Sequence, residues 1–131
     1  MTHPTPTRPS FGIMTAPMQV DYHDVLRVWR EADAVPEIEH AWLFDHLMPI
    51  GGGRPCPRGG PCSPPSPPTI GRDPAEITRS VHLPVSYDRP EDTRNAIGEA
   101  TAAGFHHLVL GLSAPYPADV ARWVADELID T

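Results

Sequence analysis

A proline- and glycine-rich stretch at residues 48–69 constrains the fold most, because it holds eight of the 18 prolines and five of the 10 glycines in the chain. Such a segment has almost no periodic apolar residues, and it cannot bury enough surface to offset the entropy of ordering it. We therefore expect a linker over 48–69 between two folded arms, residues 10–47 and 70–131, and a disordered N-terminus over 1–9.

The first arm has the pattern of a strand, a helix and a second strand. Residues 11–15 form a short apolar run, and residues 22–34 carry an apolar stripe at helical spacing, which predicts an amphipathic helix lying on a sheet. The stripe consists of Val25, Val28, Trp29 and Ala32. Asp21 is the expected N-cap of this helix, Pro36 ends it, and residues 41–44 give the second strand.

The second arm repeats the alternation. We expect its elements at 73–76 (helix), 81–85 (strand), 90–103 (helix), 105–110 (strand) and 118–129 (helix). Asp88 is the expected N-cap of the longer helix, and Gly104 is placed to end it. The residues expected to face inward are Ala96, Ile97 and Ala100 in that helix and Val120, Trp123, Val124 and Leu128 in the last one. Alternating strands and helices predict an α/β fold with a parallel sheet and right-handed crossovers.

Charge and hydropathy exclude some functions. The chain holds 17 acidic against 10 basic residues, a net charge of -7, which argues against a nucleic-acid partner because phosphates favour a basic face. No apolar run approaches the ~20 residues of a membrane span, and the first residues lack a secretory signal pattern. These features predict a cytoplasmic protein with a small-molecule ligand and no membrane partner.

Cysteine and histidine spacing gives little support for a metal site. Cys56 and Cys62 lie in the linker with no second pair at ligand spacing, so we expect neither a disulfide nor a metal there. His106 and His107 are consecutive on a predicted strand and therefore point to opposite faces. His82 on the preceding strand could approach one of them, and a histidine pair on adjacent strands could bind zinc, but no third ligand is evident, and we expect no metal.

Several segments of both arms resemble one enzyme family. They are FGIMTAPMQ, VWREAD, AWLFDHLMP, GRDPAEITRS, VSYDRPEDTRNAIGEATAAGF and LVLGLSAPYPADVARWVADEL. Together they resemble luciferase-like monooxygenases and oxidoreductases, and within that family the branch that uses coenzyme F420, an 8-hydroxy-5-deazaflavin. The resemblance covers roughly residues 10 to 50 and 70 to 131.

The resemblance implies a (β/α)8 TIM barrel of which this chain has only a part. The first arm is similar to the family's first strand, first helix and second strand, and the second arm is similar to the segment from the helix before strand 7 to helix 8. The third to sixth strands have no counterpart. Because strand 8 neighbours strand 1 in a closed barrel, we expect about four parallel strands, equivalent to 7-8-1-2, with helices on the outer face.

The resemblance also implies site residues. It assigns Asp45 and His46 to catalysis and coenzyme binding, Gly111 and Ser113 to the coenzyme loop, and Met14 and Met18 to the substrate pocket. These six positions are Met14, Met18, Asp45, His46, Gly111 and Ser113. From the residues alone, a turn-capping aspartate, a solvated histidine and methionines that fill apolar space are alternatives.

Two functions remain open from the sequence. The first is a luciferase-like oxidoreductase, impaired by truncation, that oxygenates a small organic substrate or transfers a hydride to or from it, with coenzyme F420 as the expected cofactor and FMN as the second choice. The second is a catalytically inactive half-barrel or a self-associating module. The open edges of a partial sheet would suit a homodimer.

Overall fold

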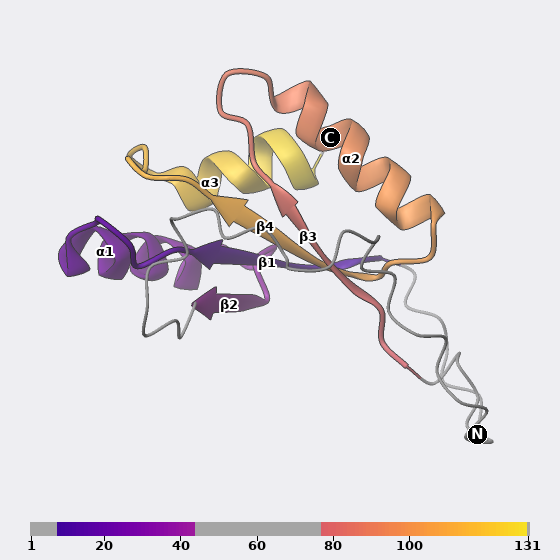
Figure 1. The fold of residues 1–131 in the computed structure, drawn as a ribbon, viewed down its shortest axis with the longest axis horizontal. Coiled ribbons are helices and arrows are strands. Elements are labelled where there is room, and N and C mark those ends of the chain that lie inside the picture. Colours follow the sequence, from indigo (N-terminus) through magenta and orange to yellow (C-terminus); the bar gives the residue numbers. More distant parts are fainter. Residues whose placement is uncertain (1–7, 44–76, 131) are drawn as a thin grey trace, which may run out of the picture.

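The computed structural model describes residues 8–43 and 77–130, which form one parallel sheet and its helices (Figure 1). The elements in chain order are β1 (Ser10–Thr15), α1 (Tyr22–Asp33), β2 (His40–Leu43), β3 (Ser80–Pro84), α2 (Pro90–Ala102), β4 (His107–Leu112), α3 (Val120–Val124) and a π-helical turn, η2 (Ala125–Ile129). The predicted linker and the predicted helix at 73–76 lie outside the described residues.

The sheet has four strands in the order β2-β1-β4-β3, all parallel. Strand β1 from the first arm lies at its centre, where Ile13 pairs with Ala41 of β2 on one side and Leu110 of β4 on the other. The expected α/β fold with a four-stranded parallel sheet is confirmed. The two arms therefore share one sheet.

The three helices of the described residues cover the same face of the sheet. The β1-α1-β2 and β3-α2-β4 units step across the sheet in the same direction, so right-handed crossovers place α1 and α2 on the same side. Helix α3 lies between them (Figure 1). Arg94 of α2 joins this layer by donating to the carbonyl of Glu127 in η2 at 2.9 Å.

The core lies between this helix layer and the two central strands. The strand residues that point toward it alternate along the chain, as period-two geometry requires, and they are Phe11, Ile13 and Thr15 in β1 and Leu108, Leu110 and Leu112 in β4. The helices contribute mainly Val25, Val28, Ala32, Ile97, Val120, Val124 and Leu128. Trp29 anchors α1 to the sheet by donating from Nε1 to Thr15 Oγ1 at 3.0 Å.

Two helix ends follow the sequence prediction. Asp21 accepts a hydrogen bond from the backbone N–H of His23 at 2.8 Å and so caps α1. Gly104, at φ 88°, follows α2 in the left-handed conformation that glycine adopts without strain. The N–H groups of Gly104 and Phe105 then donate back to the carbonyls of Thr101 and Ala100, which closes the helix.

The prediction for the start of α2 was wrong. Asp88 is exposed, and the N-cap is Arg89, followed by Pro90 in the first turn. The entry is fixed instead by Ser86 and Thr93: the Ser86 N–H donates to Thr93 Oγ1 at 3.0 Å, and the Arg89 N–H donates to Ser86 Oγ at 3.2 Å. Aspartate is a common N-cap residue and Asp88 lies one position before the N-cap, which is why the sequence favoured it. The hydroxyl groups of Ser86 and Thr93 make the hydrogen bonds at this helix start instead.

Two other boundaries shift. Strand β4 begins at His107 rather than at Phe105, because the Phe105 N–H closes the end of α2. The last helix begins at Val120 rather than at 118, because Asp119 has φ 53°, and its second half widens into the π-helical η2. The predicted inward residues Val120, Val124 and Leu128 are buried. Within residues 8–43 and 77–130, no helix is both long and apolar enough to cross a bilayer.

Candidate functional site

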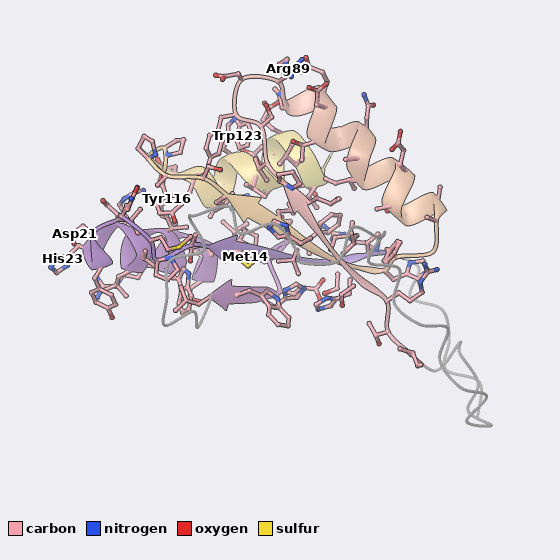
Figure 2. All side chains as sticks on the ribbon, in the orientation of Figure 1. Met14, Asp21, His23, Arg89, Tyr116 and Trp123 are labelled. Atoms are coloured by element: carbon pink, nitrogen blue, oxygen red, sulfur yellow. The ribbon has the colours of Figure 1, made fainter. Side chains whose placement is uncertain are left out.

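The side of the sheet opposite the helices is the open face, since no described helix covers it. Alternation along the four strands assigns eleven residues to it: Ser10, Gly12 and Met14 of β1, His40 and Trp42 of β2, Ser80, His82 and Pro84 of β3, and His107, Val109 and Gly111 of β4. Figure 2 shows Met14 on the sheet and Trp123 on the helix side. Three imidazoles and one indole thus share a single surface.

His40 and His107 form a stacked pair across the sheet. Their ring centroids are 4.1 Å apart and their planes differ by 12°. The pair forms although β1 lies between β2 and β4, because the position it crosses is Gly12. A Cβ at Gly12 would overlap the His40 ring. A glycine in the central strand therefore makes room for the imidazole of the edge strand.

Two polar side chains hold this pair. Trp42 Nε1 donates to His40 Nδ1 at 2.7 Å, and Ser80 Oγ lies 2.9 Å from His107 Nδ1. The Trp42 ring also makes an edge-to-face contact with both imidazole rings, and its centroid lies 6.0 Å from the His40 centroid and 5.9 Å from the His107 centroid. Since the His40 Nδ1 lone pair accepts from Trp42, the neutral His40 ring carries its proton on Nε2.

The surroundings of His40 favour its neutral form. Burial lowers the pKa of His40 and the nearby His107 lowers it further, while Glu39 acts in the opposite direction. Glu39 is itself held by Ser10, whose hydroxyl donates to its carboxylate at 2.8 Å. The stacked pair therefore favours a neutral His40 ring.

A second row crosses the open face near the carboxyl ends of the strands. Met14 is the register partner of Trp42 on one side and Gly111 on the other, and Gly111 is the partner of Pro84. The His82 ring lies over Gly111 and fills the space that a side chain there would need. The row therefore combines an imidazole, a thioether and an indole.

The geometry limits the chemistry of these groups. An imidazole ligand holds a metal close to its ring plane, so two nearly parallel stacked rings do not converge on one ion. Among the described residues there is no cluster of three histidine, cysteine or carboxylate side chains that could hold a metal. What the arrangement can do is donate and accept hydrogen bonds through its imidazoles and present an aromatic surface.

The residues predicted for the site fall in different places. Asp45 and His46 lie outside the described residues. Met14 and Gly111 are brought together as register partners on β1 and β4. Ser113 follows β4, and its carbonyl accepts a hydrogen bond from the Tyr87 hydroxyl at 3.0 Å, while Met18 is 45 % exposed in the loop after β1.

Sequence reasoning missed His40. The signal was present, because His40 and Trp42 are two residues apart on a strand and must share a face. What the sequence could not indicate was that this face turns away from the helices, or that Gly12 of the neighbouring strand is in register with His40. The His82 ring, which the spacing suggested could approach another histidine, lies over Gly111.

A small apolar cavity of about 200 Å³ lies on the helix side, where α1 meets the ends of β1 and β2. Its lining residues are Pro17, Val20, Tyr22, Val25, Leu26, Trp29 and Leu43. The cavity lies at the carboxyl end of the strands, the end that parallel α/β proteins use for ligands.

No protein-family model, curated protein or solved structure matches this chain. The basis for a functional assignment is therefore the strand order, the open face and the carboxyl edge of the sheet.

Proposed function

We propose that this chain is a shortened luciferase-like oxidoreductase built on part of a (β/α)8 barrel. The observation that carries the proposal is the strand order β2-β1-β4-β3, together with the position of every described helix on one face of the sheet. In a closed barrel the last strand pairs with the first, and the helices form an outer ring. The four strands correspond in this view to strands 2-1-8-7.

The main alternative architecture fits less well. A doubly wound sheet reverses the direction of its crossovers near the middle, which places helices on both faces. Here both crossovers run in one direction, and α3 lies between α1 and α2 (Figure 1). This arrangement supports the barrel comparison, with the open face corresponding to the barrel interior.

The proposed chemistry belongs at the carboxyl ends of the strands. Asp45 and His46 follow the end of β2 at Leu43 by two and three residues. Met14 and Gly111 lie near the same edge on the open face. In this proposal His46 exchanges the substrate hydroxyl proton, because imidazole titrates near neutral pH, and Asp45 lies beside the coenzyme ring.

The described residues suit only the planar part of a flavin or deazaflavin. Met14 and Trp42 could face a flat ring, but the His82 ring occupies the space over Gly111. The phosphate end of the coenzyme needs a cation or free backbone N–H groups. Arg27 near this edge already donates to the carbonyls of Tyr116 and Pro117, at 2.9 and 3.2 Å. The described part of the chain therefore does not form a complete coenzyme site.

A direct titration tests the proposal. The purified chain is titrated with coenzyme F420, with FMN as the comparator, while tryptophan fluorescence and the mass of the complex are followed. The expected result is saturable binding with a dissociation constant on the order of micromolar. A folded chain that binds neither coenzyme would overturn the assignment.

Paired variants test the role of His46. If the chain binds coenzyme, His46→Ala should abolish coenzyme-dependent turnover of a small alcohol panel and leave binding within a few-fold, because the proton acceptor is lost. His23→Ala removes an exposed imidazole at the start of α1, away from the sheet (Figure 2), and should have no effect. Equal activity of the His46 variant and the parent would remove His46 from the mechanism.

A second candidate is a catalytically inactive half-barrel that pairs with another chain. It is favoured by the sheet edges, because within the described residues β2 and β3 each have one hydrogen-bonded neighbour. Unpaired strand edges are templates for association. Absence of coenzyme binding together with a stable homodimer would favour this candidate over the oxidoreductase.

A further inference from the structure

The open face is an unusual surface for a parallel sheet to expose. Parallel sheets occur almost only with both faces covered, since the crossover helices shield them. Here the helices cover one face, and on the other Trp42 is 46 % exposed. A second surface of matching shape would complete the packing.

Charge favours a second copy of this chain as that surface. None of the eleven open-face residues is an aspartate, glutamate, lysine or arginine, although the whole chain has a net charge of -7. Two copies therefore meet least repulsion when their open faces come together. The charged residues that directly precede β2 and β3 are already engaged: Glu39 accepts from Ser10, and Arg79 donates to the Ala103 carbonyl at 2.9 Å.

The shape of the face also suits sheet-on-sheet packing. Gly12 and Gly111 carry no side chains, and the rings of His40 and His82 occupy the space above them. The result is a low surface of aromatic and imidazole rings on which Trp42 remains partly exposed. Stacked sheets pack about 10 Å apart through such interdigitated side chains.

We propose that the chain forms a homodimer through its open faces and that protonation of His40 separates the two copies. Each copy places the His40 ring on its open face, so protonation of His40 brings two like charges into an interface whose eleven positions per copy include no acidic or basic side chain of fixed charge. Strand β1 contributes no titratable group to the open face, and β4 contributes His107. Strand β2 contributes His40, which follows Glu39, and β3 contributes His82, with Arg79 just before the strand. Such a dimer does not require a coenzyme.

The direction of the pH effect separates this dimer from a general charge effect. The isoelectric point of the chain is about 5.3, so acidification from neutral pH reduces the overall negative charge and should promote association. Protonated open faces would have the opposite effect. Dissociation on acidification can therefore be attributed to the open face and not to the overall charge of the chain.

Sedimentation equilibrium of the full chain at about pH 8 and about pH 5.5 tests the proposal, these values lying on either side of the usual histidine pKa. We expect a dimer at the higher pH and a dissociation constant roughly tenfold or more weaker at the lower one. A monomer at about pH 8 and micromolar concentration would overturn the proposal. So would a dimer that tightens or stays unchanged on acidification.

A matched pair of substitutions places the interface. His82→Lys puts a permanent charge on the open face at an exposed edge-strand position and should weaken the dimer at about pH 8 roughly tenfold or more. His23→Lys makes the same change on α1, and the dimer should remain. Circular dichroism checks that both variants fold. Equal dimerisation of the two variants would show that the copies associate through another surface, such as the sheet edges.

Discussion

Thr93 is the buried polar residue on which the entry to α2 depends. Its side chain is 2 % exposed, and its hydroxyl accepts the Ser86 N–H at 3.0 Å. Thr93→Val keeps the volume but leaves that N–H without its acceptor, so we expect a loss of about 1–2 kcal/mol in the free energy of unfolding. Urea denaturation followed by circular dichroism measures the loss.

Thr101→Val is the control for this prediction. The Thr101 hydroxyl donates to the Ile97 carbonyl at 2.8 Å, one turn earlier in the same helix. The Ile97 carbonyl also has its helical N–H partner, so removal of the Thr101 hydroxyl leaves no buried group unpaired. We expect a change of less than about 0.5 kcal/mol here. Equal losses in the two variants would contradict the role assigned to Thr93.

His40 should make stability depend on pH. Burial, and to a lesser extent His107, lower its pKa below the ordinary 6.5, so the unfolded chain takes up the proton more readily than the folded one. The stabilisation is complete above about pH 6.5 and is lost as the pH falls through the interval between the two pKa values. The free energy of unfolding should therefore decrease on acidification in this range.

His40→Phe tests the origin of this dependence. Phenylalanine keeps a flat ring against His107 but has no proton to gain, so the decrease in stability between about pH 7.5 and 5.5 should be smaller than in the parent. His23→Phe, at an exposed position, should leave the dependence unchanged. A parent and a His40 variant with the same pH profile would rule out His40 as its source.

At the scale of elements, Arg27 links α1 to the loop between β4 and α3. Its guanidinium donates to the carbonyls of Tyr116 and Pro117 and pairs with Glu31 at 2.6 Å. Tyr116 in turn donates to the Ala16 carbonyl at 3.3 Å, which fixes the loop against the end of β1. One side chain thus joins segments that are distant in the sequence.

Arg27→Lys should weaken this link, because an ammonium group cannot make the forked contacts of a guanidinium. We expect a loss of roughly 1–2 kcal/mol in the free energy of unfolding, measured by urea denaturation. Arg30→Lys changes an exposed arginine one turn along the same helix and should cost little. A larger loss at position 30 than at 27 would contradict the assignment.

The elements differ in how far the sequence could predict them. Strand β1 and helix α1 follow from local patterns, since the apolar run at 11–15, the apolar stripe of the helix and the Asp21 cap can be read without any distant contact. The start of β4 and the π-helical turn η2 depend on how α2 closes and how the last helix packs, which periodicity does not describe. The open-face cluster likewise depends on register, because His40 reaches His107 only across Gly12.

At the scale of the whole molecule, the order of strands in space differs from their order in the chain. The sheet runs β3, β4, β1, β2, so the second arm of the sequence comes first in the sheet. The central pair, β1 and β4, joins residues from opposite ends of the chain, with Ser10 the partner of His107. Neither arm can complete the sheet without the other, and we expect them to fold together.

The ends of the described chain meet. Arg8 and Asp130 form an ion pair at 3.8 Å, beside the start of β1 and the end of η2. A circular permutant that joins residue 130 to residue 8 and opens the chain between 43 and 77 would run β3-α2-β4-α3-β1-α1-β2, an uninterrupted series of βα units in spatial order. All strand pairings would then be local in sequence, so stopped-flow refolding of the permutant should be faster than that of the parent, with the same sheet as its product.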